Sequence, residues 1–223
     1  MKSAIVILIS LFVNIQTHLY AQDETIDDKK LSKVREYKNL EEALEKPERV
    51  YKLSLTRQNL SVLSPEIGKL KNLQRLDLSS NKLRTFPKEI SRLKNLQYLN
   101  ISSNTLLNLS QVFGVMAKLT HVREISLQDN LITILPANIA KLKNIEVIDL
   151  SYNPHLKLKQ TFLVLAKLPN LKVLNLIESN ITSLPDEIGQ LQSLEELNLN
   201  WNKFPEKEKD RIRKLLPNTK ITF

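Results

Sequence analysis

The sequence predicts an α/β solenoid, with a curved parallel sheet on its concave side, short 3₁₀ or α-helical segments on its convex side, and helical caps at both ends. Leucines at offsets 0, 3 and 5, followed by an asparagine at offset 8, recur every 23 or 26 residues, and such a period is typical of solenoids. Apolar residues alternate within each candidate strand, as in a sheet with one buried face. The core is aliphatic, since 42% of the residues are hydrophobic but 5% are aromatic.

Residues 1–21 are predicted to form a Sec signal peptide. Lys2 supplies the positive charge at the start, and residues 4–13, AIVILISLFV, form an apolar core that is too short to span a bilayer. We expect cleavage after Ala21, which predicts a secreted protein or one in the periplasm or on the cell surface. Because Leu19 is larger than the residue preferred at its position, a retained, uncleaved anchor is the alternative.

Residues 22–36 are highly charged and nearly free of large apolar side chains, which predicts a flexible leader. Residues 37–49 then predict an N-terminal capping helix. Asn39 is the expected N-cap, Glu42 would close a capping box, and Pro47 would end the helix. A solenoid needs its first apolar edge covered, and this helix is placed to cover it.

Residues 50–204 contain seven repeats. They start at Val50, Leu73, Leu96, Val122, Ile145, Leu171 and Leu194. In five of them an asparagine follows the predicted strand, and its side-chain amide can bond to buried backbone groups of neighbouring turns. The first and sixth repeats carry Gln58 and Ser179 at this position, so we expect weaker hydrogen bonding to the neighbouring turns there.

The segments that return from one strand to the next are of two kinds. Repeats one, two, four and six have a proline near the turn that leads into the return segment, which leaves room for a short helical or 3₁₀ stretch. These prolines are Pro65, Pro87, Pro136 and Pro185. Repeats three and five lack this proline and are three residues longer, and their apolar spacing predicts a longer helix. Residues 205–223 predict a C-terminal cap, with a helix that begins at Pro205 and ends before Pro217, followed by an edge strand at Lys220–Phe223.

The repeat at Leu73–Leu96 follows the pattern LxxLxLxxNxLxxLPxxIxxLxxL, with Phe86 for one leucine. With this pattern, the chain resembles the leucine-rich-repeat family over roughly residues 50–216. The 23-residue form with Leu-Pro is similar to Ras-group plant proteins and metazoan Ras-pathway scaffolds. The signal peptide, the N-terminal helix and the C-terminal ending look more like small secreted bacterial proteins, notably those of spirochaetes. His155 departs from the pattern, since a leucine belongs there. The resemblance implies a horseshoe whose concave strands and adjoining loops bind proteins.

Side chains that point out of the predicted strands, together with the two residues after each strand, form four columns on the concave face. These 28 positions hold three basic and six acidic residues, so the net charge of +9 comes from the convex side, the loops and the caps. Apolar and aromatic groups beside carboxylates are typical of protein-binding surfaces. The predicted ligand-binding residues are Tyr98, Glu124, Asp129, Val147, Asp149, Tyr152, Val173, Ile177, Glu178 and Trp201. For Trp201, packing against the C-terminal cap is the alternative, and for the two valines it is strand preference alone.

We expect a monomeric, non-enzymatic module that binds a protein ligand, such as a host cell-surface or extracellular-matrix protein. The chain has no cysteine, and His121 and His155, the histidines outside the signal peptide, lie far apart in the array. We therefore predict no catalytic residue, metal site or cofactor. Export and the lack of a binding motif argue against nucleic acid. One alternative is a scaffold in a signalling complex. The other is weak attachment to anionic glycans or lipids through the basic residues Lys69, Lys71, Arg92, Lys94, Lys141 and Lys143.

Overall fold

The computed structural model describes residues 25–223 and divides the chain into two compact units, with the boundary after Lys33. The predicted signal peptide and its cleavage site lie outside the described residues. The described part of the first unit contains helix α2 (Asp28–Lys33). Asp27 caps this helix by accepting a hydrogen bond from the backbone N–H of Lys30 at 2.8 Å. This corrects the expectation of a flexible leader for part of residues 22–36, because a local N-cap can start a helical turn without a long apolar pattern.

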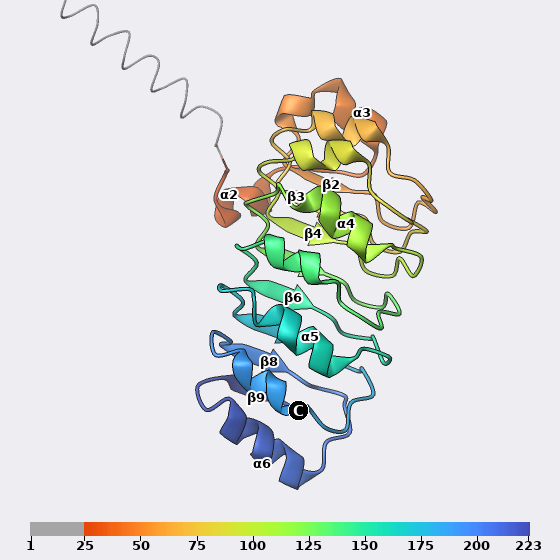
Figure 1. The fold of residues 1–223 in the computed structure, drawn as a ribbon. Helices are drawn as coiled ribbons and strands as arrows, with labels where there is room; N and C mark the ends of the chain where they lie inside the picture. The colour runs from red at the N-terminus through yellow and green to blue at the C-terminus, as the bar shows by residue number, and fades with distance from the viewer. Residues whose placement is uncertain (1–24) are drawn as a thin grey trace, which may run out of the picture. The chain divides into compact units, whose positions relative to one another are not determined.

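In the second unit, Val34–Phe223, the described residues form one open sheet of nine parallel strands in chain order (Figure 1). The strands are β1 (Glu36–Tyr37), β2 (Lys52–Ser54), β3 (Arg75–Asp77), β4 (Tyr98–Asn100), β5 (Glu124–Ser126), β6 (Val147–Asp149), β7 (Val173–Asn175), β8 (Glu196–Asn198) and β9 (Lys220–Thr222). Lys52 pairs with Arg75 and Arg75 with Tyr98, as the predicted columns require. The seven predicted repeat strands, β2–β8, are confirmed. β1 places Glu36 in a strand rather than in the leader.

The predicted difference between the two kinds of return segment is confirmed. Repeats one, two, four and six contain the 3₁₀ helices η2 (Pro65–Lys69), η3 (Lys88–Arg92), η4 (Ala137–Lys141) and η5 (Asp186–Gln190). Repeats three and five contain the α-helices α4 (Leu109–Met116) and α5 (Leu158–Leu165). These segments lie on one side of the sheet, in front of it in Figure 1. The longer repeats have room for an α-helix because three extra residues supply nearly one more turn.

The N-terminal cap consists of α3 (Leu40–Glu45) and the 3₁₀ helix η1 (Pro47–Arg49). Asn39 accepts a hydrogen bond from the backbone N–H of Glu42 at 3.2 Å, as predicted for an N-cap. The carboxylate of Glu42 pairs with Arg35, which takes the place of the predicted return bond of a capping box.

The C-terminal cap consists of α6 (Glu206–Leu215) and β9. Pro205 is the N-cap of α6, so the helix begins one residue later than predicted. Ile212 is buried in the common apolar core, and the rings of Phe204 and Phe223 meet edge to face, with their centroids 5.6 Å apart. β9 pairs with β8 as the last strand of the sheet, which confirms the predicted edge strand.

The asparagine column is buried and joins neighbouring repeats. Asn153 is 1% exposed and uses both ends of its side-chain amide. Its Oδ1 accepts from the backbone N–H groups of Asn130 and Ile132 at 3.2 and 2.9 Å. Its Nδ2 donates at 3.0–3.1 Å to the carbonyl oxygens of Leu127, Leu150 and Ser151. One side chain thus satisfies backbone N–H and carbonyl groups that have no partner in the sheet, and these groups belong to two neighbouring repeats.

Gln58 and Ser179, which replace the asparagine in the first and sixth repeats, make fewer of these hydrogen bonds. The hydroxyl of Ser179 accepts from the backbone N–H of Asn153 at 3.4 Å, a longer bond than those to the asparagine oxygens. The side chain of Gln58 is exposed and donates instead to the carbonyl oxygen of Lys38. Both observations agree with the expected weaker hydrogen bonding at this position in the first and sixth repeats.

A second ladder of side chains, which the sequence did not reveal, lies where each convex segment returns to the next strand. Each of its members hydrogen bonds to a backbone carbonyl oxygen of the preceding repeat or cap. The members are Asn72, Asn95, His121, Asn144 and Asn170. Nδ1 of His121 lies 2.8 Å from the carbonyl oxygen of Lys94. Because a carbonyl group only accepts, this nitrogen carries the hydrogen, and the imidazole takes the place of an asparagine amide.

Candidate ligand-binding face

The predicted ligand-binding residues lie in strands β4–β7 or in the turns after β5–β8. Tyr98, Glu124, Val147 and Val173 pair one after another along the first column. The two valines are half-buried, whereas Glu124 is exposed. The structure therefore keeps these residues on one face of the sheet but distributes them over several repeats.

The fourth column lies in a tight turn at the carboxyl end of each strand. Asp129, Tyr152, Glu178 and Trp201 have φ angles of 53°, 58°, 47° and 63°, in the left-handed region that residues other than glycine rarely adopt. The first three of these turns are held by the next repeat, as where the backbone N–H of Tyr152 donates to the carbonyl oxygen of Ile177 at 2.9 Å. All four side chains are exposed. Sequence columns could align these residues but could not show this conformation.

Two of these turn residues are aromatic. Trp201 is 80% exposed and Tyr152 is 40% exposed. The alternative that Trp201 packs against the C-terminal cap is therefore wrong, because a packed indole loses most of its accessible surface. Glu178, in the repeat between them, occupies the same column.

Tyr152, Glu178 and Asp149 form a small electrostatic cluster. A hydrogen bond to Glu178, together with the negative charges of Glu178 and Asp149, raises the pKa of the Tyr152 hydroxyl. A carboxylate beside a neutral phenol favours the protonated phenol, which is the physical cause of this direction. The cluster offers a ligand one aromatic ring next to negative charge.

Four residues of the second column have a structural role that their sequence positions did not reveal. Each accepts a hydrogen bond from the backbone N–H two residues later, at 2.8–3.2 Å. They are Asp77, Asn100, Asp149 and Asn198. Such bonds shape the turn after the strand. The predicted site residue Asp149 is thus also part of the fold, and its replacement would disturb the turn.

A hollow of about 220 Å³ lies over β3–β5, in another part of the face. Its polar lining consists of Glu36, Arg75, Asp77, Tyr98, Asn100, Glu124 and Ser126. The guanidinium carbon of Arg75 lies 4.6 Å from the centre of the Tyr98 ring, a distance typical of a cation–π contact. The structure therefore brings Tyr98 and Glu124 together, but Arg75 covers one face of the Tyr98 ring.

Comparison with known proteins identifies the family. A family model described as leucine rich repeat matches residues 48–106 and 163–204. The chain belongs to the leucine-rich-repeat family. Among solved structures, a leucine-rich-repeat protein of Leptospira interrogans aligns with 22% sequence identity and a TM-score of 0.41, over 85% of this chain and 100% of that chain. No curated protein matches the sequence.

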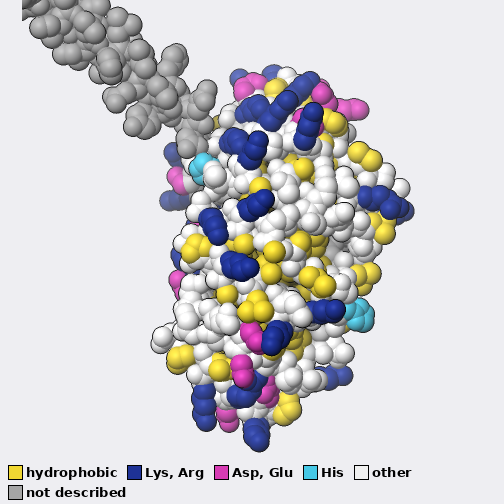
Figure 2. Space-filling model, viewed as in Figure 1, with side chains coloured by type: hydrophobic (Ala, Val, Ile, Leu, Met, Phe, Trp, Pro, Cys, Tyr) yellow, Lys and Arg dark blue, Asp and Glu magenta, His cyan; other side chains and the backbone are white. Residues whose placement is uncertain are grey.

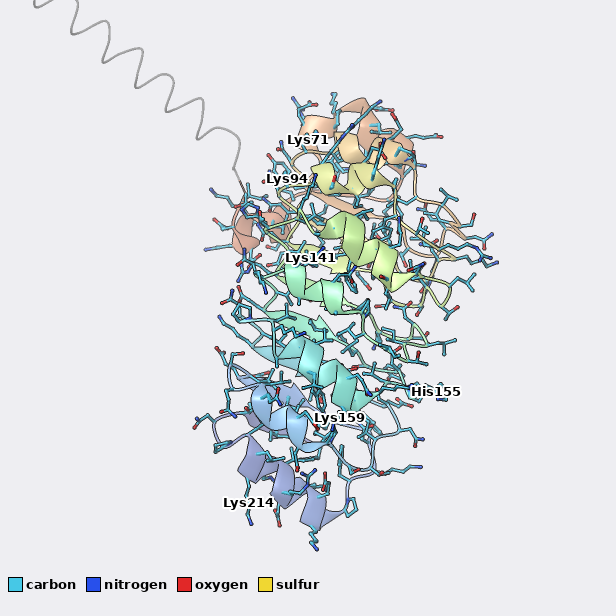
Figure 3. All side chains as sticks on the ribbon, in the orientation of Figure 1. Lys71, Lys94, Lys141, His155, Lys159 and Lys214 are labelled. Carbon is cyan, nitrogen blue, oxygen red and sulfur yellow. The ribbon has the colours of Figure 1, made fainter. Side chains whose placement is uncertain are left out.

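The described part of the leucine-rich-repeat protein contains no group of three or more histidine, aspartate or glutamate side chains placed to hold a metal ion. His121 belongs to the second ladder, and His155 is an exposed residue of the fifth repeat (Figure 3). Within residues 25–223, no helix is both long enough and apolar enough to cross a membrane.

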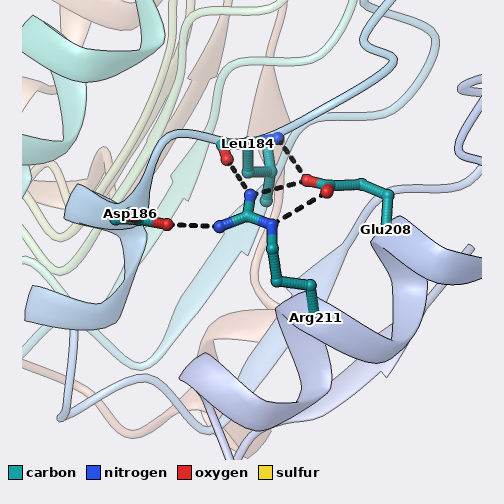
Figure 4. Close-up of polar contacts among 4 residues, drawn as sticks. All are labelled: Leu184, Asp186, Glu208 and Arg211. Carbon is teal, nitrogen blue, oxygen red and sulfur yellow. Dashed lines mark hydrogen bonds and ion pairs between the residues drawn. The ribbon is translucent and has the colours of Figure 1, made fainter.

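The C-terminal cap of the leucine-rich-repeat array is fixed by hydrogen bonds around Arg211 (Figure 4). Its guanidinium donates to both carboxylate oxygens of Glu208, at 2.7 and 2.8 Å, and also contacts Asp186 and the carbonyl oxygen of Leu184. Glu208 accepts from the backbone N–H of Leu184 at 2.9 Å. The bond from Arg211 is the largest of the effects that lower the pKa of Glu208. This network ties α6 to the sixth repeat, next to a cavity of about 590 Å³.

Proposed function

We propose that this leucine-rich-repeat protein is a non-enzymatic module that holds a protein ligand on the exposed face of its sheet. Leucine-rich-repeat proteins generally act as protein-interaction modules, which supports this class of function. The observation that carries the proposal is the exposure of two aromatic side chains, Trp201 at 80% and Tyr152 at 40%, in turns with left-handed backbone. The turn of Tyr152 is held by its bond to Ile177, and that of Trp201 by the side chain of Asn202, which donates to the carbonyl oxygens of Leu199 and Asn200. Aromatic side chains in fixed positions often dominate the binding energy of protein interfaces.

The charges around these aromatic residues indicate the chemistry of the ligand. Glu178 and Asp149 lie close enough to Tyr152 to raise its pKa, and Asp129 accepts a hydrogen bond from Ser103 at 2.9 Å in the same column. The hollow over β3–β5 adds Glu36 and Glu124. We infer a ligand surface that combines basic side chains with an apolar group, since opposite charges at an interface favour encounter and register.

The proposed location is outside the cytoplasm, where the ligand would be a cell-surface or extracellular-matrix protein. The apolar segment at residues 4–13, preceded by Lys2, supports export. We propose that the protein acts as a monomer, and the helices at the two ends of the array support this: Ala43 of α3 and Ile212 of α6 are buried in the common core, so they cover apolar surface that would otherwise be exposed at the ends.

A displayed library of random peptides, selected against the full chain, would supply ligands for the measurement while the natural partner is unidentified. We expect the selected peptides to combine Lys or Arg with an apolar side chain. The double variant Trp201→Ala, Tyr152→Ala should bind them about tenfold more weakly or worse, because it removes both exposed aromatic anchors. Its melting temperature should stay within about 2 °C of the unmodified protein, because neither side chain is packed in the core.

Val62→Ala is the matched control, since Val62 is an apolar side chain that is 73% exposed and lies outside the sheet. This variant should keep its affinity for the same peptides. Equal binding by the double variant and the unmodified protein would refute the site. An equal loss in Val62→Ala would also refute it, because general loss of apolar surface would then explain the result.

A further inference from the structure

The convex side carries a second surface, which the proposed function does not use. Exposed cations lie where the convex segments end and the chain returns to the sheet. One of them, Lys69 at the end of η2, pairs with Glu66. We call the following seven the basic stripe: Lys71, Arg92, Lys94, Lys118, Lys141, Lys143 and Lys167. Figure 3 labels Lys71, Lys94 and Lys141 one below another beside the convex segments. In Figure 2, dark blue side chains follow this side of the same face.

The charges of the basic stripe are not neutralised by the protein. Among the described residues, none of its members forms an ion pair. Nearby cations do have partners: Arg123 and Lys172 both pair with Glu146, at 2.9 and 3.4 Å. In the stripe, partial burial and the positive charges of Arg92 and Lys94 lower the pKa of Lys71. Lys71, Arg92 and Lys94 therefore lie close enough to repel each other, and an anion would relieve this repulsion.

The second ladder fixes the spacing of the basic stripe. The backbone carbonyl oxygens of three stripe lysines accept hydrogen bonds from ladder residues of the next repeat, at 2.8–3.3 Å. These lysines are Lys71, Lys94 and Lys143. Two stripe side chains also reach along the row, since Nζ of Lys94 and Nζ of Lys143 donate to the carbonyl oxygens of Lys118 and Lys167, at 2.9 and 3.3 Å. The stripe is thus a row of cations held in register by the fold.

The row is long and narrow. Lys71, Lys94, Lys118, Lys143 and Lys167 stand in successive repeats, and neighbouring strands lie about 4.8 Å apart, so the row extends over at least about 20 Å. The same convex segments also carry carboxylates, since Glu66 and Glu89 lie in the first turns of η2 and η3. A flat anionic bilayer would face these carboxylates as well as the lysines, whereas a single polymer chain could follow the lysines alone.

The composition of the row also narrows the class of partner. The large aromatic side chains that are exposed among the described residues, Tyr152 and Trp201, lie on the other face, and the imidazole of His121 beside Lys94 is held by the carbonyl oxygen of that lysine. The row therefore lacks the free stacking aromatic side chains that accompany basic grooves in single-stranded nucleic-acid binding. The large apolar side chains that are exposed in the described residues belong to other positions, so the row offers nothing to insert into lipid. We propose that the basic stripe binds a linear acidic polysaccharide, whose sulfate or carboxylate groups lie along the lysines of successive repeats.

The test compares two variants of the full chain that lose the same charge. The stripe variant carries Lys71→Gln, Lys94→Gln and Lys143→Gln. The control variant carries Lys82→Gln, Lys157→Gln and Lys203→Gln. These three lysines are exposed and lie outside the basic stripe, one to four residues after the asparagines Asn81, Asn153 and Asn202. Circular dichroism would confirm that both variants are folded. Their affinity for a fluorescent heparin oligosaccharide would be measured at about 0.05 M and about 0.15 M salt, a range over which such binding changes strongly.

We expect the stripe variant to bind the oligosaccharide about tenfold more weakly or worse, and the control variant to stay within about twofold. The salt dependence should become shallower for the stripe variant alone, because fewer counterions are released on binding. Equal losses in both variants would overturn the proposal, since net charge would then explain them. Undetectable binding by the unmodified chain at the lower salt would also overturn it. So would tighter, stripe-dependent binding to phosphatidylserine vesicles or to single-stranded oligothymidylate, which would identify a different partner.

Discussion

The contribution of the asparagine ladder to stability can be tested at Asn153. In Asn153→Ala, the backbone N–H groups of Asn130 and Ile132 lose the oxygen that now accepts from both. The position is 1% exposed, so water does not readily replace that oxygen. A stranded buried donor costs about 1–3 kcal/mol, and two of them give an expected loss of roughly 2–5 kcal/mol in the free energy of unfolding. The carbonyl oxygen of Ser151 adds little, because it still accepts from Asp129.

Two further variants make this prediction quantitative. Oδ1 of Asn130 accepts from one backbone N–H, that of Asn104 at 2.7 Å, so Asn130→Ala should cost about 1–3 kcal/mol. Asn170 is exposed and makes one bond, to the carbonyl oxygen of Lys143, so Asn170→Ala should cost less than about 1 kcal/mol.

Urea unfolding followed by circular dichroism would measure these differences. The dependence of the free energy on urea should be compared among variants, because a damaged central rung can uncouple the two halves of a repeat array. If Asn153→Ala costs no more than Asn170→Ala, the reasoning from stranded donors is refuted.

Two other predictions concern contacts between repeats. A Cβ at Gly68 would lie 2.7 Å from the backbone oxygen of Glu89, so Gly68→Ala should lower the free energy of unfolding by about 1–3 kcal/mol in thermal denaturation; Gly189→Ala, at the equivalent position, meets nothing closer than 3.7 Å and should be nearly neutral, and equal effects would contradict this account. Glu208 has a lowered pKa in the fold, so its charge stabilises the protein above the unfolded pKa near 4.5 and loses this effect as pH falls through the folded value. Glu208→Gln should therefore cost about 1–2 kcal/mol at neutral pH, a figure reduced for the partial exposure of Arg211, and close to nothing in acid; a loss in urea unfolding that persists in acid would contradict it.

Much of the fold was predictable because each repeat contains the same pattern of apolar and polar residues. The strand register from Lys52 to Glu196 follows from the repeat starts, and the longer convex helices of repeats three and five follow from three extra residues. Helix α2 and strand β1 were not predicted. One depends on a single capping aspartate and the other on backbone pairing at an edge, and neither leaves an apolar pattern in the sequence.

The sequence predicted which residues share the exposed face of the sheet, but not what surrounds each of their side chains. Counting columns placed Tyr98, Tyr152 and Trp201 on the exposed side of the sheet. It could not show that Arg75 covers the Tyr98 ring, or that the turn before each ladder position holds its residue at positive φ. The sequence did contain one indication of these turns. The residue before the asparagine position is polar in five of the seven repeats, and the two exceptions are Tyr152 and Trp201.

A short pattern that recurs every 23 or 26 residues was enough to predict the period, the strands and the buried asparagines, and local helix-start and helix-stop residues predicted the caps. They sufficed because alternation, helical spacing and turn chemistry act over a few residues. The surroundings of each side chain depended on packing between repeats. Glu178 reaches Tyr152, and Lys94 meets His121, from one repeat away. Such pairs are adjacent in space but distant in the chain, so the exposed aromatic residues and the spacing of the basic stripe became visible when the repeats were stacked.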